Sequence, residues 1–248
     1  MKRPVQVILL VLSGLGLLHA SLFTDLCLRY VKEGLRPMLI ASGALLLVLG
    51  LADAVWGRGR GDHGHSGQGH SGHGHDHSGA PRIAWLLFLP VLSLLFYAPP
   101  ALGAYTAARE APHAVKEQRH FDPLPTTSPV PMTLTDFTTR VQQDRKQAIK
   151  GRSVRMTGFV TPDKQAGSWY LTRIIFSCCA ADAQSVKVRV YGKPALSANT
   201  WVAVTGTWHP GGTLGTSSAS AALDARTVER IVRPVNAYTD DLPLDPSR

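Results

Sequence analysis

Two adjacent cysteines and a nearby aspartate carry the most distinctive chemistry in the sequence: Cys178, Cys179 and Asp182. They stand in the string Cys-Cys-Ala-Ala-Asp-Ala at the end of a predicted strand. Neighbouring strand residues point to opposite faces of a sheet, so both thiols reach one metal ion only if the backbone turns there. The two alanines permit such a turn. Two thiolates and a carboxylate suit a soft or borderline cation such as zinc, with His209 a candidate fourth ligand.

Two other interpretations of the cysteine pair stay open. A vicinal disulfide would make the segment a thiol-redox centre, although such a bond needs strained geometry. Alternatively, both cysteines are inert packing residues, as we expect for the isolated Cys27. Three cysteines, two of them adjacent, exclude a disulfide-stapled scaffold.

A second candidate metal site lies in segment 61–79, where Gly and Ser separate histidines in repeated His-x-His spacing. Six of the chain's ten histidines fall there: His63, His65, His70, His73, His75 and His77. Neutral imidazoles bind Zn²⁺, Cu²⁺, Ni²⁺ and Co²⁺ well. A flexible Gly/Ser segment fixes no coordination geometry, so the sequence predicts a divalent transition metal without identifying it. A low-complexity linker with incidental histidines is the alternative.

Common enzyme motifs are absent from the sequence. It contains no Gly-rich phosphate loop, no nucleophile elbow and no His-Glu-x-x-His motif, so we predict a non-enzymatic protein. The formal net charge is +9, most of it in residues 133–248. Because no dense basic block or aromatic stacking face is evident, we expect a membrane surface as the neighbour and no nucleic acid as the partner.

The elements that would position these residues differ between the two halves of the chain. In residues 133–235, a short helix starts at Thr133 with the apolar stripe Leu134, Phe137 and Val141. Apolar and polar residues then alternate in five predicted strands: Val154–Val160, Trp169–Phe176, Val186–Val190, Thr200–Trp208 and Ala225–Val232. This pattern predicts a small OB-like β-barrel, with a β-sandwich fragment as the alternative. Residues 236–248 form a predicted polar tail.

The first 105 residues contain three long apolar runs: Val5–Phe23, Met38–Ala52 with its flanks, and Ile83–Tyr105. A membrane-spanning helix needs roughly 20 mostly apolar residues, so residues 1–105 are predicted as a transmembrane domain of three helices. A Pro-rich linker, 106–132, follows it. The predicted fold class is therefore a membrane-anchored α part followed by an all-β domain.

The start of the chain, Met1-Lys2-Arg3, resembles the charged region of a secretory signal. The numbers of Lys and Arg on the two sides of the three apolar runs are nearly equal and favour neither membrane orientation. We therefore predict a cytoplasmic N-terminus from the signal-like start of the chain. We predict a multi-pass protein of the bacterial plasma membrane, with its C-terminal domain outside the cytoplasm. Three helices are too few for a self-contained transporter with inverted repeats.

Several short strings together carry a family resemblance: Asp136-Phe137, Gly158-Phe159-Val160, and Thr172-Arg173 leading into Cys178–Ala183. With the N-terminal helices, the chain resembles the YcgQ-type bacterial family of two-component permease subunits. The resemblance implies a larger multi-spanning permease subunit as partner, and no established catalytic residue. The predicted function is a permease subunit that handles a divalent metal such as zinc. The alternatives are a membrane-anchored thiol-redox protein and a structural anchor for the OB-like domain.

Overall fold

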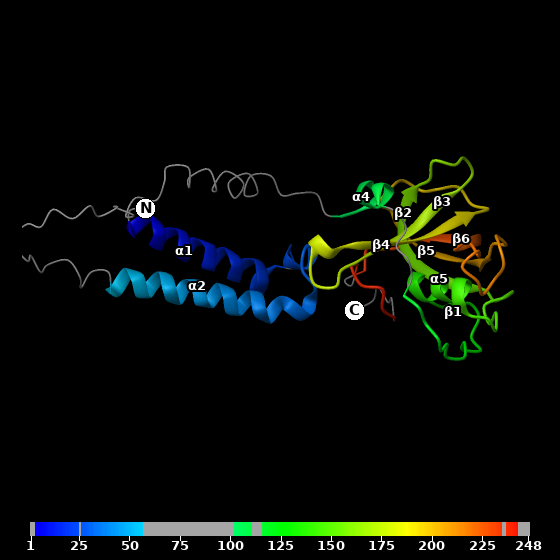
Figure 1. Ribbon diagram of the computed structural model, residues 1–248. Coiled ribbons are helices and arrows are strands. Elements are labelled where there is room, and N and C mark those ends of the chain that lie inside the picture. Colours follow the sequence, from blue (N-terminus) through cyan, green and yellow to red (C-terminus); the bar gives the residue numbers. More distant parts are fainter. Residues whose placement is uncertain (1–2, 25, 57–101, 111–115, 235–236, 243–248) are drawn as a thin grey trace, which may run out of the picture. The chain divides into compact units, whose positions relative to one another are not determined.

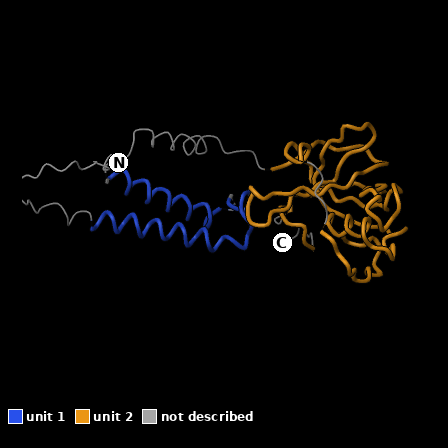
Figure 2. The backbone as a smooth tube through the Cα atoms, in the orientation of Figure 1, with its two compact units in different colours: residues 1–101 blue, residues 102–248 orange. Residues whose placement is uncertain are grey.

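The computed structural model describes residues 3–24, 26–56, 102–110, 116–234 and 237–242. The chain divides into two compact units at residues 101 and 102, shown in separate colours in Figure 2. The histidine segment 61–79 lies outside the described residues, as do residues 83–101 of the third predicted span.

Unit 1 contains two long helices, α1 (Arg3–Leu18) and α2 (Arg36–Trp56), which pack side by side (Figure 1). Between them lie the π-helical turn η1 (His19–Phe23) and the 3₁₀ turns η2 (Leu26–Arg29) and η3 (Glu33–Leu35). The helices meet at glycines, because a Cβ atom on Gly14 would come within 2.9 Å of the Gly43 carbonyl oxygen. Close approach of small residues is typical of helix pairs in membranes.

The outer faces of these helices are apolar. Leu12 and Val48, for example, are 60% and 61% exposed. Two stretches, Pro4–Phe23 and Glu33–Trp56, are long and apolar enough to cross a membrane, judged by length and composition. Both lie near the N-terminus, where a signal sequence has the same character. The described residues therefore contain two candidate spans of the three predicted.

The end of the third predicted run belongs to unit 2. Residues Ala104–Arg109 form the short helix α4, whose Ala104 and Ala107 are buried in that unit. The predicted linker 106–132 therefore starts as a helix. Its last residues are also part of the fold, because Val130 and Met132 are both about 1% exposed and β1 (Val130–Pro131) pairs with the sheet.

Helix α5 (Leu134–Gln143) confirms the predicted helix and its apolar stripe. Thr133 caps its N-terminus by accepting a hydrogen bond from the Asp136 backbone N–H at 3.0 Å. Leu134, Phe137 and Val141 are fully buried. They join a core cluster with the inward residues of the sheet, including Met156, Leu171 and Val204.

The five predicted strands are all present. They are β2 (Val154–Pro162), β3 (Trp169–Ile175), β4 (Gln184–Tyr191), β5 (Trp201–Trp208) and β6 (Ala222–Arg230). The described part of the chain forms one six-stranded mixed sheet, ordered β1-β2-β3-β4-β6-β5, with an additional pairing between β2 and β5. The pairings β2–β3–β4–β6–β5–β2 thus run in a circuit. Two pairs, β1–β2 and β4–β6, are parallel.

Residues 237–242, at the start of the predicted polar tail, pack against unit 2. Ala237 and Tyr238 are buried, and the Tyr238 ring stacks on Phe176 with centroids 4.3 Å apart. The Phe176 backbone N–H also donates to the Tyr238 carbonyl oxygen at 3.1 Å. This segment is therefore part of the packed domain.

Candidate functional site

The cysteine pair lies in the loop that joins β3 to β4, at the projecting tip of this hairpin (Figure 1). The loop turns through the 3₁₀ turn η5 (Ala180–Asp182). The Asp182 carboxylate holds the turn by accepting backbone hydrogen bonds at 3.1 Å from Ser177, 2.7 Å from Cys178 and 3.3 Å from Cys179. Three N–H donors on one carboxylate fix the backbone that carries both thiols.

This turn brings the two side chains together. Cys178 Sγ lies 3.6 Å from Cys179 Sγ, and neither cysteine is in a disulfide. The Cys178 side chain is exposed and that of Cys179 is half-buried. Adjacent residues of a regular strand would point their side chains apart, so the convergence of the thiols depends on the loop.

Asp182 also controls the protonation of the Cys178 thiol, to which it is hydrogen-bonded. A hydrogen bond to the Asp182 carboxylate, followed by one to Cys179, raises the pKa of Cys178 to about 11. The same bond from Cys178, with the backbone donors, lowers the pKa of Asp182. At neutral pH Cys178 is therefore a thiol and Asp182 a carboxylate, and a metal that binds Cys178 must displace its proton.

His209 lies far from this loop. Its ring packs on Tyr191 with centroids 4.3 Å apart, and its Nδ1 is 2.7 Å from Asp224 Oδ1. Tyr191 ends β4, whereas the cysteine loop precedes Gln184 at the other end. The eight residues of β4 span roughly 23 Å from the first to the last. The structure thus separates His209 from the thiols it was expected to join.

The described residues supply only part of the predicted metal ligands. They contain no group of three or more His, Cys, Asp or Glu side chains arranged to hold a metal ion. Asp182 lies beside the thiols, and each of its oxygens accepts a backbone hydrogen bond. Of the predicted set, the structure brings together Cys178, Cys179 and Asp182 and leaves His209 apart.

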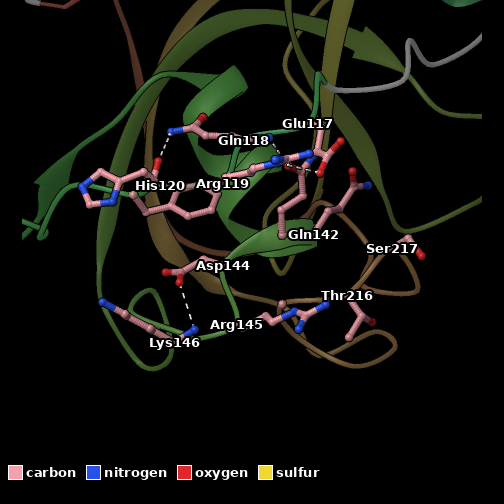
Figure 3. A pocket seen from close by; sticks show the side chains of 13 residues that line it. Glu117, Gln118, Arg119, His120, Gln142, Asp144, Arg145, Lys146, Thr216 and Ser217 are labelled. Carbon is pink, nitrogen blue, oxygen red and sulfur yellow. Dashed lines mark hydrogen bonds and ion pairs between the residues drawn. The ribbon is translucent and has the colours of Figure 1, made fainter.

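A polar cleft of about 630 Å³ lies elsewhere on unit 2 (Figure 3). Segment 117–121, the end of α5 with its following turn, and loop 215–217 form its walls. The cations Arg119, Arg145 and Lys146 are nearly balanced by Glu117 and Asp144, and Arg119 already pairs with Glu117 at 3.4 Å. The lining favours no charged class of ligand, and the sequence offered no motif for it.

The sequence-based prediction of the site did not include a buried ion pair between Arg173 and Asp240. Arg173 is fully buried, and its Nε lies 4.0 Å from Asp240 Oδ1 and donates to the Thr239 carbonyl oxygen at 3.0 Å. Burial lowers the pKa of Arg173, an effect that Asp240 and Asp241 oppose. The signal was present in the sequence, because an arginine inside an apolar strand requires a carboxylate.

Comparison with known proteins bears on this second unit. Residues 132–239 match the family model of the DUF1980 C-terminal domain. The match includes the strand circuit, the cysteine loop and the Arg173–Asp240 neighbourhood up to Thr239. It supports a DUF1980 or YcgQ-like family at a coarse level. No curated protein and no solved structure matches the chain.

Proposed function

We propose that this chain is a non-enzymatic membrane subunit in which Cys178 and Cys179 bind a divalent, thiol-seeking metal such as zinc. The domain that presents them is an OB-type barrel in this proposal. The circuit of pairings among β2–β6 supports that architecture, because an OB barrel closes five strands in the same way.

The distance between the two sulfur atoms is the main observation in favour of a metal site at Cys178 and Cys179. Zinc binds thiolates at about 2.3 Å, so two ligands of a tetrahedral site lie about 3.8 Å apart. The observed Sγ–Sγ distance is 3.6 Å. A disulfide needs about 2.05 Å, so oxidation requires a much larger movement of this loop than metal binding does.

The position of the pair fits a site completed by other groups. Two thiolates are half of a tetrahedral set, and the exposed Cys178 leaves room for further ligands from outside the loop. In this proposal Asp182 acts as a positioning residue that holds the turn. The six histidines of segment 61–79 form a second, weaker site that binds metal through imidazole.

Membrane attachment and a partner complete the proposal. The apolar stretches Pro4–Phe23 and Glu33–Trp56 support an anchor in the bacterial plasma membrane. The family resemblance of the sequence is the ground for proposing a larger multi-spanning permease subunit as partner, since the match of residues 132–239 names no partner. We propose that the soluble domain lies outside the cytoplasm.

Cobalt titration of the reduced full chain in detergent tests the site. Sulfur-to-cobalt charge-transfer bands arise only from thiolate ligands, so the histidine segment does not contribute to them. We expect these bands in the wild type and their loss in Cys178→Ser and Cys179→Ser. The matched control Cys27→Ser, and a variant with Ala at all six histidines, should retain them. Because protons compete for the thiolates, binding should strengthen as the pH rises.

Two results would overturn the metal assignment. One is absence of the bands in the reduced wild type. The other is their persistence after Cys178→Ser and Cys179→Ser. A reversible Cys178–Cys179 disulfide without cobalt binding would favour thiol-redox chemistry instead. Purification of the chain without a multi-spanning protein bound to it would argue against the permease partner.

A further inference from the structure

Helix α4 lies across the outer face of the sheet in unit 2, against β2 and β3 (Figure 1). At one end, the Asn199 side chain accepts a hydrogen bond from the Ala104 backbone N–H at 2.7 Å. At the other end, Lys187 Nζ donates to the Glu110 carbonyl oxygen at 2.7 Å. The Ser185 backbone N–H donates to the Glu110 carboxylate at 3.2 Å. Residues 102–110, here called the strap, are therefore fixed mainly at their ends.

The underside of the strap is small. Ala104 and Ala107 are its buried side chains, and they join a cluster with Phe159 and Ile174. Tyr105, in contrast, is 73% exposed and stacks under the Arg109 guanidinium, whose Cζ lies 3.5 Å from the ring centroid. Leu102 at the start of the strap is half-buried against the same cluster, but the helix that crosses the sheet buries two methyl groups and adds little hydrophobic stabilisation there.

Polar side chains on the same outer face are left without partners. The hydroxyl groups of Thr161, Thr172 and Ser185 are buried and make no hydrogen bond within the described part of the chain. The register places all three on this face, because Thr172 pairs with Phe159 and Ser185 with Ile174. A buried hydroxyl without a hydrogen-bond partner costs free energy. The strap that covers this face therefore leaves three of its hydroxyl groups without the hydrogen bonds they could make.

The groups that hold the strap recognise features common to peptides. Asn199 binds a backbone N–H, Lys187 binds a backbone carbonyl, and the Ser185 N–H binds a carboxylate. Burial lowers the pKa of Lys187, which Glu110 opposes, so its ammonium group favours an acidic neighbour. None of these contacts requires that the peptide belong to the same chain.

We propose that the outer face of β2, β3 and β4 is a docking surface for a peptide segment of a partner protein that carries small side chains and one carboxylate, and that the strap occupies it in the free chain. The incoming segment places small side chains over Phe159 and a carboxylate at the Ser185 N–H. Its polar groups pair with the three hydroxyls that the strap leaves unsatisfied. This surface adjoins the cysteine loop, whose Ala180 and Ala183 pack against the same cluster, but none of the contacts that hold the strap involves a thiol.

A labelled synthetic peptide with the sequence of residues 102–110 tests the proposal on the full chain in detergent. In the Ala107→Glu variant, the buried methyl group becomes a charged side chain, which displaces the chain's own strap and leaves the face intact. The peptide should bind this variant at least about tenfold more tightly than wild type, because apparent affinity scales with the fraction of open sites. Ala108→Glu, on the exposed side of α4, is the matched control and should behave as wild type.

A second peptide carrying Gln in place of Glu110 should bind the Ala107→Glu variant more weakly, because it lacks the carboxylate. The chain variant Glu110→Gln, which loosens only one end of the strap, should also increase peptide binding and serves if Ala107→Glu fails to fold. Equal binding to wild type and both open variants would overturn the proposal. So would equal binding of the Glu and Gln peptides, or the same gain from Ala108→Glu.

Discussion

Replacing Asp240 by Ala should strongly destabilise unit 2, although the residue lies near the end of the chain. Its carboxylate accepts backbone hydrogen bonds from Leu134 at 3.4 Å and Thr135 at 2.7 Å, at the start of α5. It also lies 4.0 Å from the Nε of the buried Arg173. The substitution removes a helix cap and leaves a buried cation with less compensation.

The two losses can be estimated separately. Loss of a helix N-terminal cap costs about 1 kcal/mol. Removing one partner of a buried ion pair costs about 3–5 kcal/mol. The Arg173–Asp240 distance is long at 4.0 Å, and the Thr239 carbonyl remains, so the lower end applies. Together these give about 4 kcal/mol, a large part of the roughly 5–15 kcal/mol that stabilises a typical domain.

Denaturant unfolding of the full chain in detergent, followed by tryptophan fluorescence, measures this loss. Trp201 is a local reporter, because Arg173 Cζ lies 5.2 Å from its ring centroid. Asp240→Asn keeps an acceptor for the α5 backbone and should lose about 1 kcal/mol less than Asp240→Ala. Asp122→Ala, at a side chain that is 91% exposed, is the control and should change stability by under about 1 kcal/mol. A loss for Asp240→Ala no larger than that of the control would refute the reasoning.

Three further substitutions have defined outcomes. Gly206→Ala should destabilise the sheet by about 2–3 kcal/mol in the same unfolding assay, because its Cβ would overlap a backbone carbonyl of β6. The alkylation rate of Cys178 should rise with pH with a midpoint at about 11, which is the pKa of its thiol. Asp182→Asn should move this midpoint to lower pH, and an unchanged midpoint would contradict the assigned hydrogen bond between Cys178 and Asp182. Burial alone would raise the pKa of Asp163, but hydrogen bonds led by that from Ser168 lower it. The ionised Asp163 therefore stabilises the fold above pH 3.8, and this contribution is lost as the pH falls further. The acid unfolding of Asp163→Asn should consequently depend less on pH than that of the wild type.

The strands of unit 2 were predictable because their sequence pattern is local. Val186–Val190 alternates strictly, and β4 contains it. The sequence pattern predicts the start of β6 at Ala225, three residues too late. Pairing with β4 and β5 extends the strand back to Ala222. The two-residue strand β1 has no local pattern, and Pro131 argues against a strand. Its pairing depends on β2, which follows more than twenty residues later.

The first two residues of helix α4 belong to the third predicted span, because Leu102, Ala104 and Tyr105 continue an apolar run, and the rest of α4 belongs to the predicted linker. Composition alone does not distinguish a residue that faces lipid from one that packs on a sheet. The distinction comes from partners far along the chain, such as Asn199, which binds the Ala104 N–H. The same limit applies to His209, since closeness to a loop in sequence does not determine which end of the sheet a residue occupies.

The geometry of the cysteine pair shows where local reasoning reached its limit. The residue types predicted thiol chemistry, and the string Ala180-Ala181-Asp182 permitted a turn. The convergence of the sulfur atoms to 3.6 Å requires three backbone N–H groups to point at one carboxylate, which no residue count specifies. The Asp182 carboxylate holds the backbone that makes two neighbouring thiols into a pair. Its role as a metal ligand stays a prediction.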